Sequence, residues 1–364
     1  MRVNGVPRRG VWLEGREVMV IDQTALPHRF ETRVLRTLDD AIDAIRHMWV
    51  RGAPLIGATA AFGVALAMRA DASDAGLADA ERRLPLARPT AVNLAWAVAR
   101  MASLLRPLPP SQRAAAALAA AVELAEEDVA INSAIGDHGL VLLRDIAARK
   151  KPGERLNILT HCNAGWLATV DWGTATAAIY KAHDCGVDVH VYVDETRPRN
   201  QGASLTAWEL GNHGVPHTLI VDNAGGHLMR LGMVDLCVVG TDRVAANGDV
   251  CNKIGTYLKA LAARDNEVPF YVAAPSPSID FALADGGDIP IEFRGEEEVL
   301  EVSGLSAGGD VVSARVAPAG TRALNPGFDV TPARLVTGLI TERGVVRPER
   351  AAMARAFPER NTSA

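Results

Sequence analysis

Four polar residues in the second half of the chain stand where chemistry is expected. Cys162, Asp194, Asp222 and Asp242 each lie at the end of a short run rich in valine, isoleucine and leucine. Near-continuous apolar runs of this length are typical of strands buried on both faces of a parallel sheet. Because ligands of an open parallel sheet lie beyond the carboxyl ends of its strands, we expect all four side chains to face one crevice, as in an enzyme.

Cys162 and Asp242 each have a functional and a structural interpretation. A carboxyl at the mouth of an apolar strand, such as Asp242, can stay protonated and act as an acid. Alternatively, it pairs with Arg243 or caps a turn. The helix predicted after Cys162 could lower the pKa of its thiol, whereas the alternative is a buried, inert cysteine. His161 is not an obvious base for Cys162, because neighbouring strand residues point to opposite faces.

Two other segments have features of phosphate sites. Arg51 and Gly52 precede Ala53 and a helix-forming run, which places a guanidinium and backbone N–H groups at a helix N-terminus. The alternative is a plain junction between a loop and a helix. Asn252 and Lys253 open another predicted helix and form a second candidate phosphate clamp.

Two more residues complete the candidate set. Arg88 stands before a predicted helix at 91–105 and repeats the first arrangement, and Gln201 lies in a polar loop where it can orient hydroxyl groups. The chain has no Gly-x-Gly-x-x-Gly after a strand, no Walker loop and no metal-binding pair of histidines four residues apart. The sequence therefore predicts a phosphorylated small molecule as the ligand.

The elements that must position these residues are strands that alternate with helices. The apolar runs lie at 158–162, 191–195, 219–223, 238–242 and 270–274. Their spacing of roughly thirty residues is typical of βαβ units. Helices are expected between them at 164–183, 204–213, 227–231 and 253–264. We therefore expect a Rossmann-like catalytic domain with a parallel sheet, but without a dinucleotide site, over residues 151–347.

The fold class predicted for the whole chain is α/β, and the remaining residues are expected to form an N-terminal domain and a C-terminal tail. Residues 1–150 are expected to form an N-terminal domain with a small antiparallel β unit at 10–38, followed by helices. These helices are expected at 39–48, 55–69, 91–105 and 114–132. Residues 295–322 are predicted to form an extended segment or loops. Thr331 and Pro332 have the pattern of an N-cap and first position of a last helix, and 348–364 is expected to be a C-terminal tail.

Composition narrows the class of protein. The 364 residues carry a formal charge of −5, which leaves no basic footprint for nucleic acid. No apolar stretch of about eighteen residues is evident, so no membrane span is expected. The N-terminus lacks the apolar core of a signal peptide. The four cysteines are irregularly spaced and indicate neither a disulfide framework nor a zinc site, so we expect a reducing cytoplasm.

Eight motifs in order resemble those of the methylthioribose-1-phosphate isomerase family. They are Arg-Gly-Ala-Pro at 51–54, Arg-Pro-Thr-Ala-Val-Asn-Leu at 88–94, Thr-His-Cys-Asn-Ala-Gly at 160–165, Asp-Glu-Thr-Arg-Pro at 194–198, Gln-Gly at 201–202, Gly-Thr-Asp-Arg at 240–243, Asn-Gly-Asp at 247–249 and Asn-Lys-Ile-Gly-Thr at 252–256. The resemblance extends from about residue 10 to 347. It is specific because the motifs stand together, while each alone is weak.

The resemblance implies an isomerase that converts an aldose 1-phosphate to the 1-phosphoketose in methionine salvage. It implies Cys162 and Asp242 as catalytic residues, no metal and no organic cofactor, and a homodimer. The implied substrate contacts are Arg51, Gly52, Ala53, Arg88, Gln201, Asn252 and Lys253. In the implied mechanism, Asp242 protonates the ring oxygen, and Cys162 acts as a base or stabilises the transition state.

Related proteins leave other functions open. Isomerases of ribose 1,5-bisphosphate or 5-deoxyribose 1-phosphate perform nearly the same chemistry. Segments 274–278 and 291–294 depart from the commoner family forms, so the preference for the 5-substituent stays open. Regulatory subunits of a translation-initiation exchange factor use the same scaffold for binding. That reading predicts loss of the catalytic pair, and both Cys162 and Asp242 are present.

Overall fold

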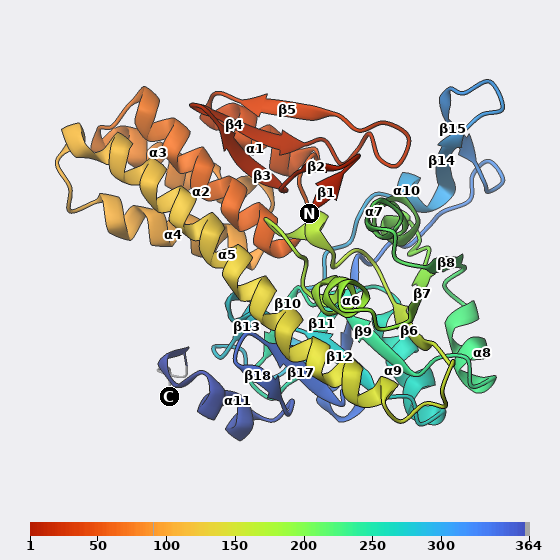
Figure 1. The fold of residues 1–364 in the computed structure, drawn as a ribbon. Helices are drawn as coiled ribbons and strands as arrows, with labels where there is room; N and C mark the ends of the chain where they lie inside the picture. Colours follow the sequence, from red (N-terminus) through yellow and green to blue (C-terminus); the bar gives the residue numbers. More distant parts are fainter. Residues whose placement is uncertain (90, 361–364) are drawn as a thin grey trace.

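A seven-stranded sheet forms the centre of the C-terminal half of the molecule (Figure 1). The computed structural model describes residues 1–89 and 91–360. The sheet has the order β18-β17-β12-β9-β6-β7-β8, and all its neighbours are parallel except β17 and β18. Its strands are β6 (Leu156–Thr160), β7 (Val189–Asp194), β8 (His217–Ile220), β9 (Leu236–Val239), β12 (Phe270–Ala273), β17 (Gly338–Thr341) and β18 (Gly344–Val346). The five predicted strands and the Rossmann-like parallel sheet are confirmed.

The order of the strands creates a switch point beside β6. From β6 the chain adds β7 and β8 on one side, and then returns to add β9 and β12 on the other. The carboxyl ends of β6 and β9 are therefore neighbours from which the connections depart in opposite directions. Such a point leaves a crevice above the sheet, which is where open α/β folds bind ligands.

Helices cover both faces of this sheet and bury their apolar sides against it. Helices α5 (Pro110–Ala147) and α6 (Ala175–Asp184) share one apolar core with β6 and β7. On the other face, the core includes residues of α8 (Ala224–Arg230) and α9 (Thr256–Asp265). That second core also buries Met353 and Phe357, from and just after α11 (Arg350–Ala356), inside the segment expected to be a tail.

The N-terminal half combines small antiparallel sheets with helices. A short hairpin, β1 (Arg2–Val3) and β2 (Val6–Pro7), precedes a three-stranded sheet. That sheet contains β3 (Val11–Glu14), β4 (Glu17–Ile21) and β5 (Thr32–Leu35). The helices that follow are α1 (Leu38–Arg46), α2 (Ala53–Ala70), α3 (Asp74–Arg83) and α4 (Val92–Leu105). Thr37 begins α1 through a capping box with Asp40, which satisfies two backbone donors reciprocally.

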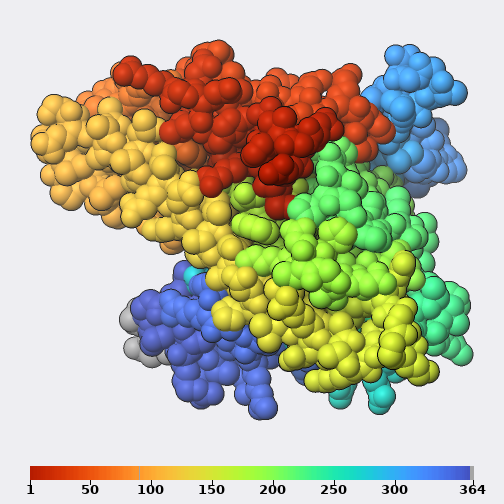
Figure 2. Space-filling view, in the orientation of Figure 1, coloured from red at the N-terminus to blue at the C-terminus, as the bar shows by residue number. Residues whose placement is uncertain are grey.

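Helix α5 connects the two halves. Its first half places Ala117, Ala121 and Leu124 in the core around α2, whereas Ile135 and Leu143 belong to the core of the large sheet. One 38-residue helix therefore packs into both cores and connects them (yellow in Figures 1 and 2). The sequence predicted only 114–132 of it, because the alanine-rich part is the most obviously amphipathic.

Helix α2 corrects the expectation that the chain has no long apolar stretch. Its 18 residues have a mean hydropathy of 1.4, enough by length and composition to cross a membrane, but 78% of them are buried inside the protein. A helix that is apolar all round is typical of a protein core as well as of a membrane. In this fold, α2 is the central helix of the N-terminal core.

Two further predictions about elements are wrong. Thr331 does not cap a last helix. It ends β16 (Phe328–Thr331), which pairs with β11 (Val250–Lys253) in a four-stranded sheet with β10 (Arg243–Ala245) and β13 (Ile279–Asp280). The strand partner outweighs the local capping pattern. The helix expected at 164–183 starts only at Ala175, after a loop that includes Gly173 at φ 80°.

The segment 295–322 forms a projecting hairpin. It contains α10 (Glu297–Leu300), β14 (Glu301–Leu305) and β15 (Val311–Arg315). Figure 2 shows this part, in light blue, standing away from the body of the molecule.

The expected helix at 204–213 begins as a π-helical turn, Gly202–Thr206, and continues as α7 (Ala207–His213).

Candidate active site

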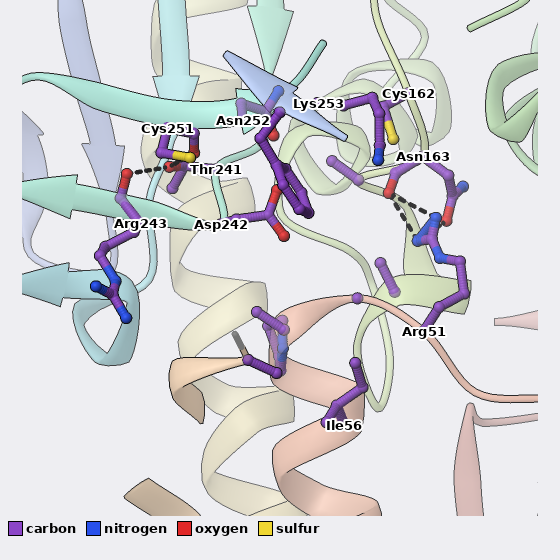
Figure 3. Close-up of a pocket in the computed structure, with 18 of the residues that line it drawn as sticks. Arg51, Ile56, Cys162, Asn163, Thr241, Asp242, Arg243, Cys251, Asn252 and Lys253 are labelled. Atoms are coloured by element: carbon purple, nitrogen blue, oxygen red, sulfur yellow. Dashed lines mark hydrogen bonds between the residues drawn. The ribbon is translucent and has the colours of Figure 1, made fainter. Parts of the chain in front are cut away.

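The residues proposed from the sequence line one cavity at the switch point of the sheet (Figure 3). They are Arg51, Gly52, Ala53, Arg88, Cys162, Gln201, Asp242, Asn252 and Lys253. They come from the start of α2, from the segment before α4, from the carboxyl ends of β6 and β9, from the loop after β7 and from β11. The fold thus brings together residues separated by up to two hundred positions.

Cys162 lies two residues beyond β6 in an unusual backbone conformation. Its φ is 65°, in the left-handed region that residues other than glycine rarely adopt. The turn is held from both sides: the amide of Cys162 donates to Thr196 Oγ1 (2.8 Å), and Thr206 Oγ1 donates to its carbonyl (2.7 Å). Burial raises the pKa of the thiol, although Arg51 and Lys253 oppose this shift. The thiol is therefore held mainly in its neutral form.

Asp242 faces the cavity from the other side of the switch point. Its amide donates to the carbonyl of Cys251 (3.0 Å), which fixes the residue between β9 and β11. Burial raises the pKa of the carboxyl, and the charges of Lys253 and Arg88 oppose it. The alternative pairing with Arg243 does not form; Arg243 instead lies 3.8 Å from Asp280. Asp242 is consequently suited to donate a proton.

Arg51 is anchored so that its guanidinium reaches the cavity wall. It donates to the carbonyl of Asn163 (2.8 Å) and to Asn163 Oδ1 (2.7 Å). Gly52 begins α2 with φ 92°, and a Cβ there would lie 2.4 Å from the carbonyl oxygen of Ala168. Only glycine permits this close approach of the start of α2 to Ala168. The predicted helix start is confirmed.

Lys253 is buried and points into the same space. Its ammonium donates to the carbonyl of Gly327 (2.9 Å) and lies 4.4 Å from the ring centre of Phe328. Burial lowers the pKa of Lys253, while Cys162 and Asp242 oppose this shift. A cation without enough counter-charge in such a wall favours an anionic ligand.

The second phosphate clamp is built differently from the prediction. Asn252 and Lys253 end strand β11, and the helix begins only at Thr256. Asn252 Nδ2 donates to Thr256 Oγ1 (3.0 Å), which holds the amide group at the strand end. Thus a side-chain cation and an amide, rather than a helix N-terminus at Lys253, face the cavity.

Arg88 belongs to a chain of alternating charges at the cavity rim. Arg88 lies 3.7 Å from Glu292, and Arg294 bridges Glu292 (2.8 Å) and Glu298 (2.5 Å). Arg199 contacts Glu298 from the opposite end at 3.0 Å. Burial by itself would raise the pKa of Glu298, yet the hydrogen bonds from Arg294 and Arg199 lower that pKa to about 2. Thr90, part of the motif that begins at Arg88, lies outside the described residues.

Arg199 and Arg294 line the cavity but were not predicted from the sequence. A single arginine in a loop gives only a weak signal, because surface arginines have the same appearance in a sequence. Gln201 was predicted, and it is only 8% exposed. Its Oε1 has no hydrogen-bond partner among the described residues, so it can accept a hydrogen bond from a ligand hydroxyl.

Asp194 and Asp222 do not face the cavity, contrary to the prediction. Asp194 is fully buried between His161 (2.8 Å) and Lys259 (3.2 Å). The carboxylate of Asp222 accepts from the amides of Thr196 and Arg197, both at 2.8 Å. β7 and β8 lie to one side of the switch point, so their ends support the loop beside the cavity.

Glu209 was also missed, although it supports the site. It is buried in α7 and accepts from Asn163 Nδ2 (3.1 Å), Leu167 N (2.7 Å) and the Tyr180 hydroxyl (3.0 Å). Burial raises its pKa to about 7. Through Asn163 it fixes the acceptor that holds Arg51. A glutamate inside a short helix gives no sequence signal for this role.

The four cysteines are free and occupy different environments. Cys251 lines the cavity with Cys162, and Figure 3 shows them on opposite sides of it. Burial raises the pKa of Cys251 to about 12. A buried, inert cysteine is the commonest case and was the prediction for both Cys185 and Cys237. Cys237 is buried, but the prediction is wrong for Cys185, which is exposed at the end of α6.

The chain is similar to known proteins over nearly its whole length. Residues 49–348 match the model of the initiation factor 2 subunit family. The chain is 65% identical over 363 residues to the methylthioribose-1-phosphate isomerase of Methylocella silvestris, covering 99% of each chain. It is 63% identical over 354 residues to that of Brucella anthropi, covering 96% of this chain and 97% of the relative.

Two solved structures are similar over nearly the whole chain. A 5-methylthioribose 1-phosphate isomerase from Pyrococcus horikoshii has a TM-score of 0.85 and 40% identity. The similarity covers 97% of this chain and 96% of the chain in that structure. A structure from A. fulgidus, described as translation initiation factor eIF-2B, subunit delta, has a TM-score of 0.81 and 38% identity. It covers 97% of this chain and 100% of its own.

Proposed function

Because the chain belongs to the methylthioribose-1-phosphate isomerases of the initiation factor 2 subunit family, we propose that it interconverts 5-methylthioribose 1-phosphate and 5-methylthioribulose 1-phosphate in methionine salvage. The observation that supports this most directly is the placement of Cys162 and Asp242. They reach one cavity from neighbouring strand ends, and its wall also carries Arg51, Arg88 and Lys253.

The three cations account for recognition of a phosphate ester. Arg51 and Lys253 are buried, and Arg88 lies at the rim. A dianionic ester would supply the counter-charge that this wall lacks, and charge-assisted hydrogen bonds would fix its position. The start of α2, with Gly52 and Ala53, adds backbone N–H groups directed at an anion.

The substrate poses a specific chemical problem. A phosphate on C1 locks the sugar as a ring, so the aldehyde needed for isomerisation is not free. In our proposal Asp242 gives its proton to the ring oxygen, and the ring opens. Its raised pKa suits an acid of this kind.

Hydrogen then moves from C2 to C1, which converts the aldose to the ketose without net oxidation. Cys162 takes part as the base that removes the C2 proton or as a group that stabilises the transition state of a hydride shift. The neutral thiol described above favours the second role, because a thiol with a raised pKa is a poor base at neutral pH. Gln201 and Asn252 would orient the sugar hydroxyls. This chemistry requires neither a metal nor an organic cofactor.

The same scaffold serves a non-enzymatic role in related subunits of initiation factors, which makes that the alternative. Retention of Cys162 and Asp242, with a cavity between them, favours the enzyme. We also infer a homodimer in the cytoplasm, as the family resemblance implies. Sedimentation analysis of the purified full chain tests whether it forms a homodimer.

The deciding experiment is an isomerase assay of the purified full chain. Methylthioribose 1-phosphate, 5-deoxyribose 1-phosphate and ribose 1,5-bisphosphate are supplied side by side, and formation of each ketose is followed. We expect the highest kcat/KM for the methylthio substrate. A preference for the bisphosphate would reassign the substrate, and no turnover of any of the three would contradict the enzyme itself.

A further inference from the structure

The ring of His161 lies between two hydrogen-bond acceptors. Nδ1 is 2.8 Å from Asp194 Oδ2, and Nε2 is 2.8 Å from the carbonyl oxygen of Ile254. A backbone carbonyl can only accept, so Nε2 must carry a proton. The same Asp194 oxygen lies 3.2 Å from the ammonium of Lys259, which identifies Asp194 as an ionised carboxylate and hence also an acceptor. Both ring nitrogens therefore donate.

From this geometry we propose that His161 is a buried imidazolium that positions Cys162 and Lys253 together. The proposal rests on the isomerase function above. His161 directly precedes Cys162, and its hydrogen-bond partner Ile254 directly follows Lys253. One rigid ring thus connects the turn that carries the thiol to the strand end that carries the ammonium. His161 is a positioning residue, since its side chain is absent from the cavity wall.

The ring has little freedom to move. Its side chain is only 1% exposed. Gly255 lies against it with φ 103°, and a Cβ there would come within 2.9 Å of the ring carbon Cε1. A residue other than glycine at 255 would push the ring away or distort the turn after Lys253. The glycine and the histidine form one packed unit.

Charges from every neighbouring element face this unit. Asp194 and Lys259 are in contact as described, and Asp222 Oδ1 lies 3.9 Å from Nδ1. Asp329 accepts from the amide of Gly255 (2.7 Å) and adds a carboxylate from β16. Three carboxylates therefore face one ammonium and the ring. A neutral ring would leave Lys259 as the one cation named here against three negative charges, so a protonated ring lowers the excess negative charge of the cluster.

A metal site is the competing interpretation of the same residues. His161, Asp194 and Asp222 offer ligand atoms within 4.8 Å of one another. However, the ammonium of Lys259 already bridges Asp194 and donates to the carbonyl of Asp222. A metal ion would have to displace that ammonium. Lys259 already supplies a cation to Asp194, whose other oxygen, Oδ1, has no hydrogen-bond partner among the described residues.

Nuclear magnetic resonance of the full chain labelled with ¹⁵N at histidine tests the proposal without substrate. Spectra are recorded at pH 8, where ordinary exposed histidines are neutral. We expect one ring with protons on both nitrogens, absent in His161→Gln and retained in His190→Gln. His190 is a suitable control because it lies in the same sheet and its ring forms a hydrogen bond with the side chain of Thr218. Asp194→Asn should also abolish the doubly protonated ring.

A wild-type spectrum without such a ring would overturn the proposal, even if His161→Gln does not fold. So would a doubly protonated ring that appears only after a chelator is added, which would support the metal, because a ring nitrogen bound to a metal ion carries no proton. Activity gives the second readout. His161→Gln should lower kcat/KM at least about tenfold, through both kcat and KM, because misplacement of catalytic groups by about 1 Å can cost about a hundredfold. His190→Gln should stay within about twofold of wild type.

A folded His161→Gln variant with unchanged kcat and KM would also overturn the positioning role. Failure of the proposed function has a different signature, because a wild-type protein inactive on all three sugar phosphates would leave the spectrum unchanged. The two ideas are therefore separable.

Discussion

The ends of β6 and β9 differ from the ends of β7 and β8, although all four look alike in the sequence. Each is an apolar run that stops at a residue able to do chemistry. Cys162 and Asp242 lie at the first pair and line the cavity. Asp194 and Asp222, at the second pair, bind His161, Lys259 and backbone amides beneath it.

The difference follows from the order of strands. Only the gap between β6 and β9 is left open by connections that depart in opposite directions. Beyond β7 and β8, the chain folds back over its own strand ends, and its amides need acceptors. In our proposal, an aspartate thus donates a proton at one pair of strand ends, whereas at the other pair it is a structural acceptor.

The strongest way to break this comparison is to replace Asp242 by Asn. We expect a normal fold and a loss of about 10²–10⁴-fold in kcat, because an amide cannot supply the proton for ring opening. The measurement is kcat on methylthioribose 1-phosphate, with Asp280→Asn as a control outside the cavity lining. More than about a tenth of wild-type kcat in Asp242→Asn would remove Asp242 from this role.

The pH profile sharpens the same prediction. Burial raises the pKa of Asp242, so its acid form persists at higher pH than in an exposed aspartate. If the protonated form is the active one, kcat/KM is full below this pKa and falls as the pH rises through it. The falling limb assigned to Asp242 should be lost in the residual activity of Asp242→Asn. An identical limb in both proteins would assign it to another group.

Cys162 should give the next largest effect. We expect Cys162→Ala to lower kcat by about a hundredfold, because both the base and the stabiliser roles need the sulfur. Cys185→Ala is the matched control, since Cys185 is exposed and outside the cavity lining. A near-normal kcat in Cys162→Ala would exclude both roles.

Alkylation checks the placement of the thiol independently. In a Cys185→Ala background, iodoacetamide should modify Cys162 and inactivate the enzyme, and substrate should protect it. Because burial raises the pKa of Cys162, the rate should rise with pH beyond that of an ordinary thiol. Loss of activity while mass mapping finds Cys162 unmodified would contradict its placement.

How much of this site was predictable depended on whether a residue's role is local. The apolar runs revealed the strands, and the ordered motifs placed Cys162, Asp242 and Lys253 in one cavity. Burial of Asp194 could not be predicted, because it depends on Lys259 and His161 arriving from other elements. The strand at Thr331 was missed for the same reason, since its partner β11 lies about eighty residues earlier.

Removal of a phosphate-binding cation should have an intermediate effect. Lys253→Ala and Arg51→Ala each remove a charge-assisted contact worth roughly 1.5–3 kcal/mol, so KM should rise about tenfold to a hundredfold. Lys181→Ala is a control, because Lys181 pairs with Asp137 away from the cavity. Unchanged KM and kcat in both variants would show that the phosphate binds elsewhere.

The smallest effect on activity is expected at Asp222, and it separates the two pairs of strand ends most clearly. Asp222→Asn leaves one oxygen to accept from Thr196 and Arg197, so one amide loses its partner, at a cost of about 1–3 kcal/mol in the free energy of unfolding. Asp222 is 23% exposed, which places the expected cost toward the lower end. Because Thr196 Oγ1 accepts from the amide of Cys162, kcat should fall only a few-fold, while KM stays near wild type. Urea unfolding and steady-state kinetics measure the two effects, and Asp188→Asn, an exposed carboxylate 3.8 Å from Arg155, should change neither. A loss of kcat as large as that of Asp242→Asn, with unchanged stability, would mean that Asp222 does chemistry in the cavity and that the two pairs of strand ends are equivalent after all.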